Sequence, residues 1–240
     1  MSNTVVVRIE RLNTLAKLKS QQKHDERKYT EKDRPEYVDT SKTHLNSVLI
    51  KHKTIDEIKD YINKVRKAKK KLRSNAVLLW SGIVAFGTEA QKKINQLSVE
   101  QQNKLFYEIV KAISDYLDVD IESIAIHRDE SAIHCHFSIY SFNRQGKSLS
   151  KALTIKDFSK LQDIASEIIK KFGINIERGK RKTDRIKDGE DYSKIIHRSV
   201  YQLHNDLPKE LEQMRMKVDN AKTQLQRLAQ ERQLIEKQLQ

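Results

Sequence analysis

The sequence contains a single cysteine, Cys135, among its 240 residues. One cysteine excludes an internal disulfide and suits a reducing compartment. No stretch approaches the run of about 18 apolar residues that a membrane-spanning helix needs, so we expect no insertion into a membrane. The opening residues, MSNTVVVRIERLN, lack the long apolar segment and the small-residue cleavage site of a secretory signal. Together these absences predict a cytoplasmic protein.

Proline and glycine are also scarce, with two and six residues respectively, so we do not expect general disorder. Acidic residues are outnumbered, because 47 Lys and Arg stand against 33 Asp and Glu, which leaves a net charge of +14. Such an excess is typical of a protein that binds phosphate groups. Charge alone leaves open a ribosomal or merely soluble basic protein.

The remaining pattern alternates between strand and helix. Short β-branched or apolar runs predict strands, and Ser or Thr capping residues before amphipathic stretches predict helices. The predicted strands are 5–9, 75–86, 121–126 and 134–142, and the predicted helices are 54–72, 98–117 and 154–172. Residues 20–46 show no clear periodicity and are expected to form a long polar functional segment.

The connection between the strands 121–126 and 134–142 is short enough that only an antiparallel pair fits it. Helices lie between the other strands along the chain. The sequence therefore predicts an α+β domain, with an antiparallel central sheet of about four or five strands and helices packed on it.

From about residue 209 the pattern changes to a heptad seam. Its apolar residues recur at alternating three- and four-residue steps, with Arg232 as the one misfit: Leu211, Met214, Val218, Ala221, Leu225, Leu228, Ile235 and Leu239. This spacing predicts a coiled coil and a homodimer formed through it, and the alternative is an amphipathic helix that folds back on the domain. We divide the chain into a main domain, residues 1–200, and a C-terminal helix, residues 201–240. Because the chain stops inside this pattern, we expect the natural protein to continue.

Three histidines stand out at the end of the predicted strand pair. His134 and His136 are two residues apart, so they share one face of a strand, while Cys135 points into the core. His127 ends the preceding strand, and a turn brings it beside them. Three imidazoles with an otherwise open coordination sphere are typical of a catalytic metal site.

The donor atoms restrict which metal this site binds. Nitrogen ligands disfavour Mg²⁺, which prefers oxygen, whereas imidazole suits manganese, zinc, cobalt or nickel. We prefer Mn²⁺, because phosphate oxygens of a substrate would complete an octahedral shell. Mg²⁺ and other divalent ions stay as alternatives.

Three motifs together resemble a known family. HRDESAIHCHF, residues 127–137, resembles the HxDExxPHxH motif of the Pre/Mob (MobV) mobilisation relaxases, which belong to the HUH endonuclease superfamily. HDERKYTEKDRPEYVDTSKTHLN, from residue 24, resembles that family's His-x-x-Arg motif followed by His-Leu-Asn. FGINIERGKRKTD, from residue 172, is similar to its Leu-Glu-Arg-Gly segment. The motifs occur in the family's order and span residues 24–185.

The resemblance implies that residues 1–200 are a relaxase domain that nicks one strand of single-stranded or supercoiled plasmid DNA at a transfer origin. It implies a covalent bond between the protein and the 5′ phosphate, and later religation. A cation held by His127, His134 and His136 would stabilise charge on the phosphate oxygens, and a covalent intermediate would preserve the bond energy.

The nucleophile is carried over from the same resemblance. The first motif's histidine is the family's favoured nucleophile and matches His24, with Arg27 as a phosphate clamp. A tyrosine often follows the family's His-Leu-Asn motif, but here that position is Ser47. Tyr29 and Tyr37, in the same segment, are the rival nucleophiles.

Two acids of the hairpin motif complete the predicted site. Glu130 is expected to take a proton from His24 or a water. Asp129 is expected to orient a ligand histidine by a hydrogen bond, without binding the metal itself. Both could equally be turn residues. The proline that precedes HxH in the family is Ile133 here, which removes no ligand.

Basic residues near the motifs are expected to contact DNA phosphates. One block runs from Lys59 to Arg73; the others are Arg128 in the hairpin motif and Arg178, Lys180, Arg181 and Lys182. The competing interpretation of each block is a solvated surface.

Three other functions compete with this one. A rolling-circle replication initiator or transposase of the HUH superfamily would use the same hairpin. A non-catalytic DNA-binding dimer would use the metal structurally. A zinc hydrolase of small molecules is disfavoured by the charge and by the absence of a helical HExxH motif.

Overall fold

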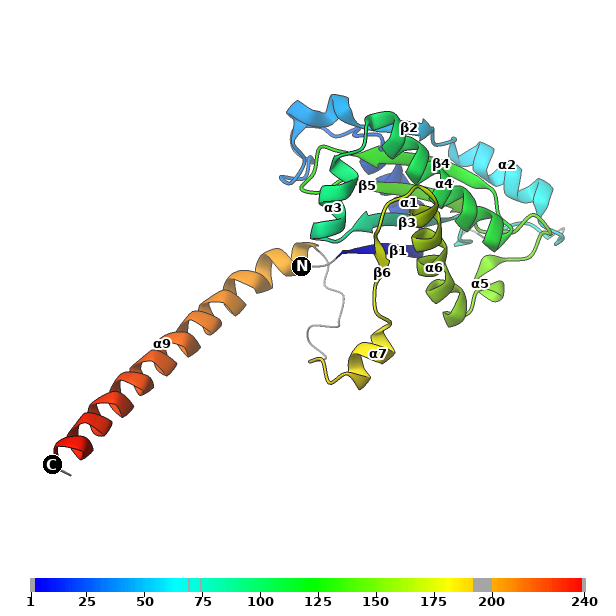
Figure 1. Ribbon diagram of the computed structural model, residues 1–240. Coiled ribbons are helices and arrows are strands. Elements are labelled where there is room, and N and C mark those ends of the chain that lie inside the picture. Colours follow the sequence, from blue (N-terminus) through cyan, green and yellow to red (C-terminus); the bar gives the residue numbers. More distant parts are fainter. Residues whose placement is uncertain (1–2, 69, 74, 192–199, 239–240) are drawn as a thin grey trace. The chain divides into compact units, whose positions relative to one another are not determined.

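The computed structural model describes residues 3–68, 70–73, 75–191 and 200–238 (Figure 1). The chain divides into two compact units, Met1–Lys180 and Arg181–Gln240. The first unit contains the sheet, and the second contains α7 (Lys182–Lys187) and α9 (Val200–Gln238). The domain boundary predicted after residue 200 borders on residues 192–199, which lie outside the described part, and it stays a prediction.

The first unit is built on a six-stranded sheet with the order β2-β4-β5-β3-β1-β6. The strands are β1 (Thr4–Arg11), β2 (Ser47–Ile50), β3 (Leu79–Phe86), β4 (Ile121–His127), β5 (His134–Tyr140) and β6 (Glu177–Arg178). Every pairing is antiparallel except that of β1 with β6, which is parallel. The predicted α+β fold with an antiparallel central sheet is confirmed, with six strands in place of four or five.

One face of the sheet is covered by α4 (Val99–Leu117) and α6 (Ile155–Lys171) (Figure 1). Both are amphipathic helices that begin at a capping box, on Ser98 and Thr154. Their apolar sides meet the inward-facing residues of the strands in the larger hydrophobic core. Gly173, with φ of +75°, follows the end of α6, as its position after the predicted helix indicates. The shorter α3 (Thr88–Asn95) and α5 (Leu149–Ala152) complete the helices of this unit's second half.

The other face carries α1 (Leu15–Asp25), the 3₁₀ helix η1 (Thr40–Leu45) and α2 (Ile55–Val65). A second, smaller core holds α1 and α2 to the sheet: Leu12, Leu18, Ile58, Ile62, Leu78, Leu79 and Tyr140. This core fixes the position of α1, which ends beside the hairpin of β4 and β5.

Alternation along β5 separates the two faces. Cys135 and Phe137 are fully buried in the larger core, so His134 and His136 point to the opposite face. The ring of Phe137 lies over Gly82, its partner on β3, where a Cβ atom would stand 2.1 Å from Phe137 Cζ. Glycine at 82 therefore allows the strand behind the histidine pair to pack closely.

Several elements differ from the sequence prediction. The helix expected over 54–72 ends at Val65, since the residues up to Arg73 are basic on most faces and offer no apolar stripe to the core. The strand expected from 75 begins at Leu79. The short strand β2 and the helices α1 and α3 were not predicted.

In the second unit, α9 presents the predicted seam to solvent. Its apolar side chains are between 52% and 67% exposed: Leu211, Met214, Val218, Leu225, Leu228 and Ile235. Leu239 lies outside the described residues. Across the described part of the chain, none of the helices combines the length and the apolar character needed to cross a membrane.

Candidate metal centre and active site

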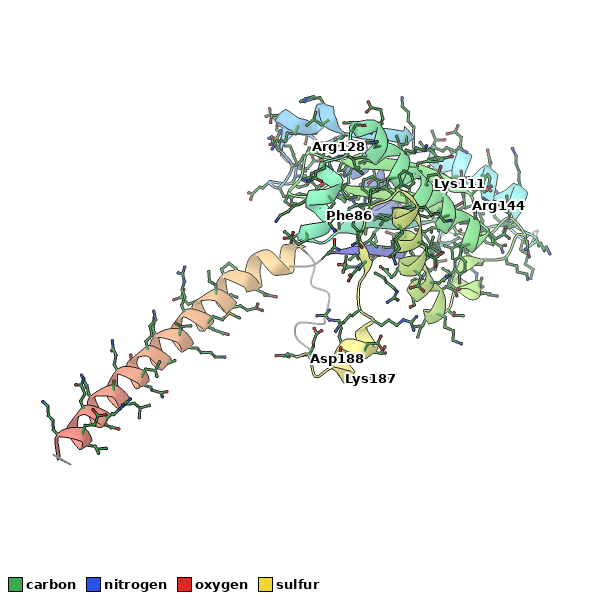
Figure 2. All side chains as sticks on the ribbon, in the orientation of Figure 1. Phe86, Lys111, Arg128, Arg144, Lys187 and Asp188 are labelled. Atoms are coloured by element: carbon green, nitrogen blue, oxygen red, sulfur yellow. The ribbon has the colours of Figure 1, made fainter. Side chains whose placement is uncertain are left out.

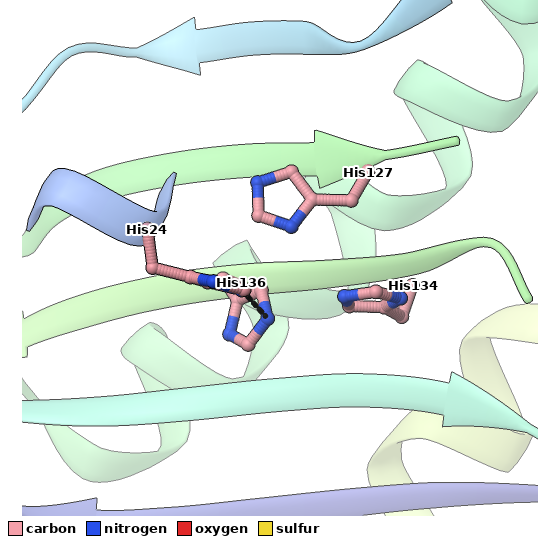
Figure 3. A group of neighbouring side chains, drawn as sticks. All are labelled: His24, His127, His134 and His136. Atoms are coloured by element: carbon pink, nitrogen blue, oxygen red, sulfur yellow. Dashed lines mark hydrogen bonds between the residues drawn. The ribbon is translucent and has the colours of Figure 1, made fainter. Parts of the chain in front are cut away.

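Four histidine side chains meet on the sheet face that α1 approaches (Figure 3). His127 ends β4, His134 and His136 lie on β5, and His24 comes from the last turn of α1. One nitrogen from each ring lies within 4.8 Å of the others. The structure thus brings together the three histidines that their spacing pointed to, and adds the one that the motif resemblance identified.

The outward nitrogens of two of these histidines are held by backbone carbonyls. His134 Nδ1 donates to the Ala132 carbonyl at 2.9 Å, and His127 Nε2 donates to the Asp25 carbonyl at 3.2 Å. These bonds leave His134 Nε2 and His127 Nδ1 as the nitrogens with a lone pair toward the centre. His127 Nδ1 is buried and has no hydrogen-bond partner among the described residues. An orphaned buried acceptor beside three other imidazoles fits a bound cation.

The electrostatic surroundings keep the rings of His24, His127 and His136 neutral. Burial, followed by the positive charge of Arg27, lowers the pKa of His127 to about 2 and that of His24 to about 4. Burial, followed by the neighbouring histidines, lowers the pKa of His136 well below its usual range. Neutral imidazoles are the form that ligates a metal, so the donor set fits a divalent cation.

Glu130 lies at the centre of the histidine cluster. Its Oε1 is 3.7 Å from His24 Nε2 and 3.8 Å from both His127 Nδ1 and His134 Nε2. The same oxygen accepts a bond of 2.7 Å from Arg27 Nη2. Glu130 is therefore within short reach of a proton or a water at His24.

Asp129 supports Arg27. The carboxylate is fully buried and accepts two bonds from the Arg27 guanidinium, at 2.9 Å and 2.6 Å, and others from Thr43 and Asn46. Burial opposes its ionisation, but the bonds from Arg27 and Asn46 outweigh burial and lower the pKa of Asp129 to about 2. Asp129 thus holds Arg27, whose Nη1 donates to the His24 carbonyl at 3.0 Å.

The two tyrosines differ in their relation to His24. The Tyr29 hydroxyl is 2.6 Å from His24 Nδ1, so His24 Nε2 is the nitrogen that faces His136, at 3.3 Å. Burial raises the pKa of Tyr29 to about 12, which keeps its hydroxyl protonated. Tyr37 is 48% exposed in the same segment.

The predicted DNA-contacting arginines make several contacts within the protein. Arg128 (Figure 2) donates to Gln102 and Asn103 of α4 and to the Leu45 carbonyl. Arg178 forms an ion pair with Asp163 and a bond of 2.8 Å to Ser159. Lys180 ends the first unit, whereas Arg181 and Lys182 begin the second, so this basic block spans the division between the units.

The basic block at 59–73 lines a cavity of about 890 Å³ in the first unit. The apolar residues that line it include Leu15 and Leu78. The charged residues among the described lining residues are all cations, with no carboxylate: Lys59, Lys64, Arg66, Lys67, Lys71 and Arg73. We call this the basic groove.

Three buried residues next to the histidine cluster were not predicted from the sequence. Asp25 and Glu122 are buried acids, and His52 lies between them. His52 follows β2 with no partner at a ligand spacing, so the sequence carries no signal for it. Only the folded arrangement shows that it approaches the site.

Comparison with known proteins agrees with this geometry. The Mob_Pre family model, described as a plasmid recombination enzyme, matches residues 1–194. A plasmid recombination enzyme of Bacillus sp is 27% identical over 209 residues, which are 84% of this chain and 49% of that protein. One of Streptococcus agalactiae is 28% identical over 165 residues, 66% of this chain and 32% of that protein. The chain thus spans half or less of the length of these curated relatives.

Among solved structures, the chain is similar to the MobM relaxase domain (MOBV; Mob_Pre) bound to plasmid pMV158 oriT DNA, a Mn-bound crystal structure at pH 6.8. The TM-score is 0.68 and the identity 24%, over 85% of this chain and 98% of that one. A second Mn-bound structure of that domain, with a 22-nucleotide oriT DNA at pH 5.5, gives a TM-score of 0.69 at 23% identity, over 85% of this chain and 99% of that one. At these identities the likeness establishes the fold.

Proposed function

The chain belongs to the Mob_Pre family of plasmid recombination enzymes, and from this premise we propose that it is a relaxase. It nicks one strand of plasmid DNA at a transfer origin and later reseals it. The observation that carries the proposal is the convergence of His24 with His127, His134 and His136 on one sheet face. Such a substrate would be met in the cytoplasm.

The metal-binding residues in this proposal are His127, His134 and His136, and the preferred ion is Mn²⁺. Their nitrogens converge, the rings of His127 and His136 are held neutral, and the similar MobM structures are described as Mn-bound. A bound divalent cation would supply positive charge against the non-bridging oxygens of the scissile phosphate.

His24 is the proposed nucleophile. In the tautomer that this role requires, His24 Nδ1–H donates to the Tyr29 oxygen at 2.6 Å, and the lone pair of Nε2 lies on the side of the cluster. Attack on phosphorus forms the Nε2–P bond and breaks the P–O3′ bond, and the departing O3′ takes a proton to become a hydroxyl. In religation the 3′ hydroxyl loses that proton and attacks the phosphorus, and His24 leaves as a neutral imidazole.

Glu130 and Arg27 assist this exchange. Glu130 Oε1, 3.7 Å from His24 Nε2, accepts or returns the proton that moves between the 3′ oxygen and the site. Arg27, fixed by Asp129, holds the backbone of the His24 turn and directs positive charge to the phosphate.

The experiment that tests this function offers the protein a pool of labelled, random-sequence single-stranded oligonucleotides with Mn²⁺. We expect a covalent protein–DNA adduct that survives denaturing detergent, one enriched sequence among the adducts, and a free 3′ hydroxyl on the released fragment. EDTA should prevent the adduct. Products that carry a free 5′ phosphate with no adduct at any time, or binding without cleavage, would contradict the proposal.

The basic groove is proposed to follow the DNA backbone in the first unit, together with Arg128, Arg178 and Lys180. Arg181 and Lys182 are proposed to contact DNA from the second unit. None of these contacts requires base recognition, so they would supply affinity more than specificity.

Neutralising the groove should weaken DNA binding. In the triple variant Lys64→Gln, Lys67→Gln and Lys71→Gln, we expect the salt dependence of the affinity to flatten by about 0.7 in log–log slope for each phosphate that the variant no longer neutralises. The matched control replaces three exposed lysines of α6, on the opposite side of the sheet: Lys156→Gln, Lys170→Gln and Lys171→Gln. Equal slopes for both triple variants would exclude the groove as a DNA-binding surface.

For the second unit we propose that α9 forms a coiled coil with a second copy of the chain. The exposed seam from Leu211 to Ile235 supports this proposal, because a regular apolar stripe is costly to leave in water.

A further inference from the structure

A buried chain of charged groups lies behind the histidine cluster. His52 Nε2 is 2.9 Å from Asp25 Oδ2, and His52 Nδ1 is 2.9 Å from Glu122 Oε2. The side chains of His52, Asp25 and Glu122 are 5%, 2% and 0% exposed. Because both partners are carboxylates that accept, the His52 ring carries a hydrogen on each nitrogen.

This protonated state has a physical origin. Burial alone would lower the pKa of His52, but the bonds to Asp25 and Glu122 outweigh burial and raise it to about 9. Glu122 is the extra residue at a register shift between Ile121 and Ser123 of β4, and it also accepts from the Lys53 amide at 2.7 Å. Such an irregularity can point a side chain to the face of the sheet opposite to the one that regular alternation would give it.

Asp25 connects these buried charged groups to the histidine cluster at three points. It follows His24 directly at the end of α1, and its carbonyl accepts from His127 Nε2. Its Oδ1 lies 4.0 Å from His136 Nδ1 and accepts from Gln21 Nε2, which also reaches His136 Nδ1 at 3.4 Å. One residue therefore adjoins the nucleophile and the outward nitrogens of two metal-binding histidines.

We infer that His52 is a positioning residue of the site, which holds Asp25 and through it fixes the rings of His24, His127 and His136. The inference rests on the proposed function, since it concerns the same histidines. The arrangement favours it over a purely structural role for His52. A buried ionic group of two acids and one base is expensive to desolvate. The Asp25 carboxylate of this group lies 4.0 Å from His136 Nδ1, and the Asp25 carbonyl accepts from His127 Nε2.

The consequence is measurable without DNA or turnover. Partners behind ligand histidines usually change metal affinity by about 10–100-fold when removed. We therefore expect His52→Gln to weaken Mn²⁺ binding by about 10–100-fold, because a neutral amide cannot donate to two carboxylates as the imidazolium does. The readout is the decrease of the free Mn²⁺ electron paramagnetic resonance signal on titration of the metal with the full chain.

A matched control separates positioning from stability. Ile58→Val trims the smaller core on the same face of the sheet, where Ile58 is fully buried. Such a truncation costs about 1 kcal/mol of stability, so both variants should unfold at lower temperature than the wild type. The Mn²⁺ affinity of Ile58→Val should stay within about twofold of the wild type. Equal Mn²⁺ affinity in His52→Gln and Ile58→Val would overturn the inference.

A second variant tests the pathway through Asp25. Asp25→Asn keeps the backbone carbonyl and the side-chain shape but loses the negative charge, and it should weaken Mn²⁺ binding to a similar extent. The double variant should cost little more than either single one, because both interrupt one chain of contacts. Fully additive losses would overturn the inference, and so would failure of both single variants to fold while Ile58→Val folds.

The same titration distinguishes this inference from the proposed function. If Mn²⁺ binding in the wild type is absent or survives His134→Ala, the metal site itself is wrong. If binding depends on His134 but is indifferent to His52, the metal site stands and the positioning role of His52 falls.

Discussion

His134→Ala is expected to abolish Mn²⁺-dependent nicking, and His127→Ala and His136→Ala are expected to do the same. Each removes one of three converging nitrogens, and the site offers no spare imidazole among the described residues except that of His24, the proposed nucleophile. A metal ion supplies several kcal/mol of charge stabilisation to such a reaction, so the loss should be about 10³-fold or more. Nicking is measured on the oligonucleotide selected from the random pool, at limiting Mn²⁺.

The same variants should retain most of their DNA affinity when it is measured in EDTA, because the proposed phosphate contacts lie in the basic groove and elsewhere. Thermal unfolding of the metal-free variants serves as the control for folding. A near-normal nicking rate in any one of them at limiting Mn²⁺ would exclude a three-histidine site.

His24→Phe is expected to remove both the covalent adduct and nicking, because phenylalanine keeps an aromatic ring but has no nitrogen that can attack. The wild-type adduct should be labile to acid, as a phosphorus–nitrogen bond is, whereas a phosphotyrosine ester survives mild acid. Since burial and Arg27 lower the pKa of His24 to about 4, its lone pair should remain available down to about pH 5. Adduct yield and its survival at low pH are followed on denaturing gels.

The tyrosine variants are the matched controls for His24→Phe. Tyr37→Phe should form the adduct at the wild-type rate, as its ring is about half exposed. Tyr29→Phe should form it more slowly, since it loses the bond of 2.6 Å that orients His24 Nδ1. An acid-stable adduct that disappears only in Tyr29→Phe or Tyr37→Phe would move the nucleophile to that tyrosine and leave the relaxase function intact.

The elements that the sequence predicts well are those whose local pattern and tertiary role agree. The strands around 121–127 and 134–140 and the helices α4 and α6 have regular apolar spacing and capping residues, and each packs on the sheet through that spacing. The HxH spacing on β5 likewise determines its own geometry, because alternate residues of a strand must share a face.

The elements that the sequence does not predict depend on distant contacts. In α1 only Leu18 and Asp25 are buried, so its sequence lacks an apolar stripe although the helix carries His24 to the site. The strand β2 has four residues and exists through its pairing with β4. The contacts among Asp25, His52 and Glu122 join three separate segments, and no spacing along the chain encodes them.

The bonds to Asp129 also bear on how this protein can diverge. Arg27 and Thr43 donate to its side chain, and the Asp39 amide donates to its carbonyl at 2.8 Å, so both ends of the intervening loop are fastened to one residue. Lengthening a loop whose ends are already joined adds little entropic cost, since that cost grows only slowly with loop size. Insertions and deletions between residues 30 and 38 should therefore accumulate among members of the family without displacing His24. Such changes would give members of the family different loop surfaces around an unchanged histidine cluster.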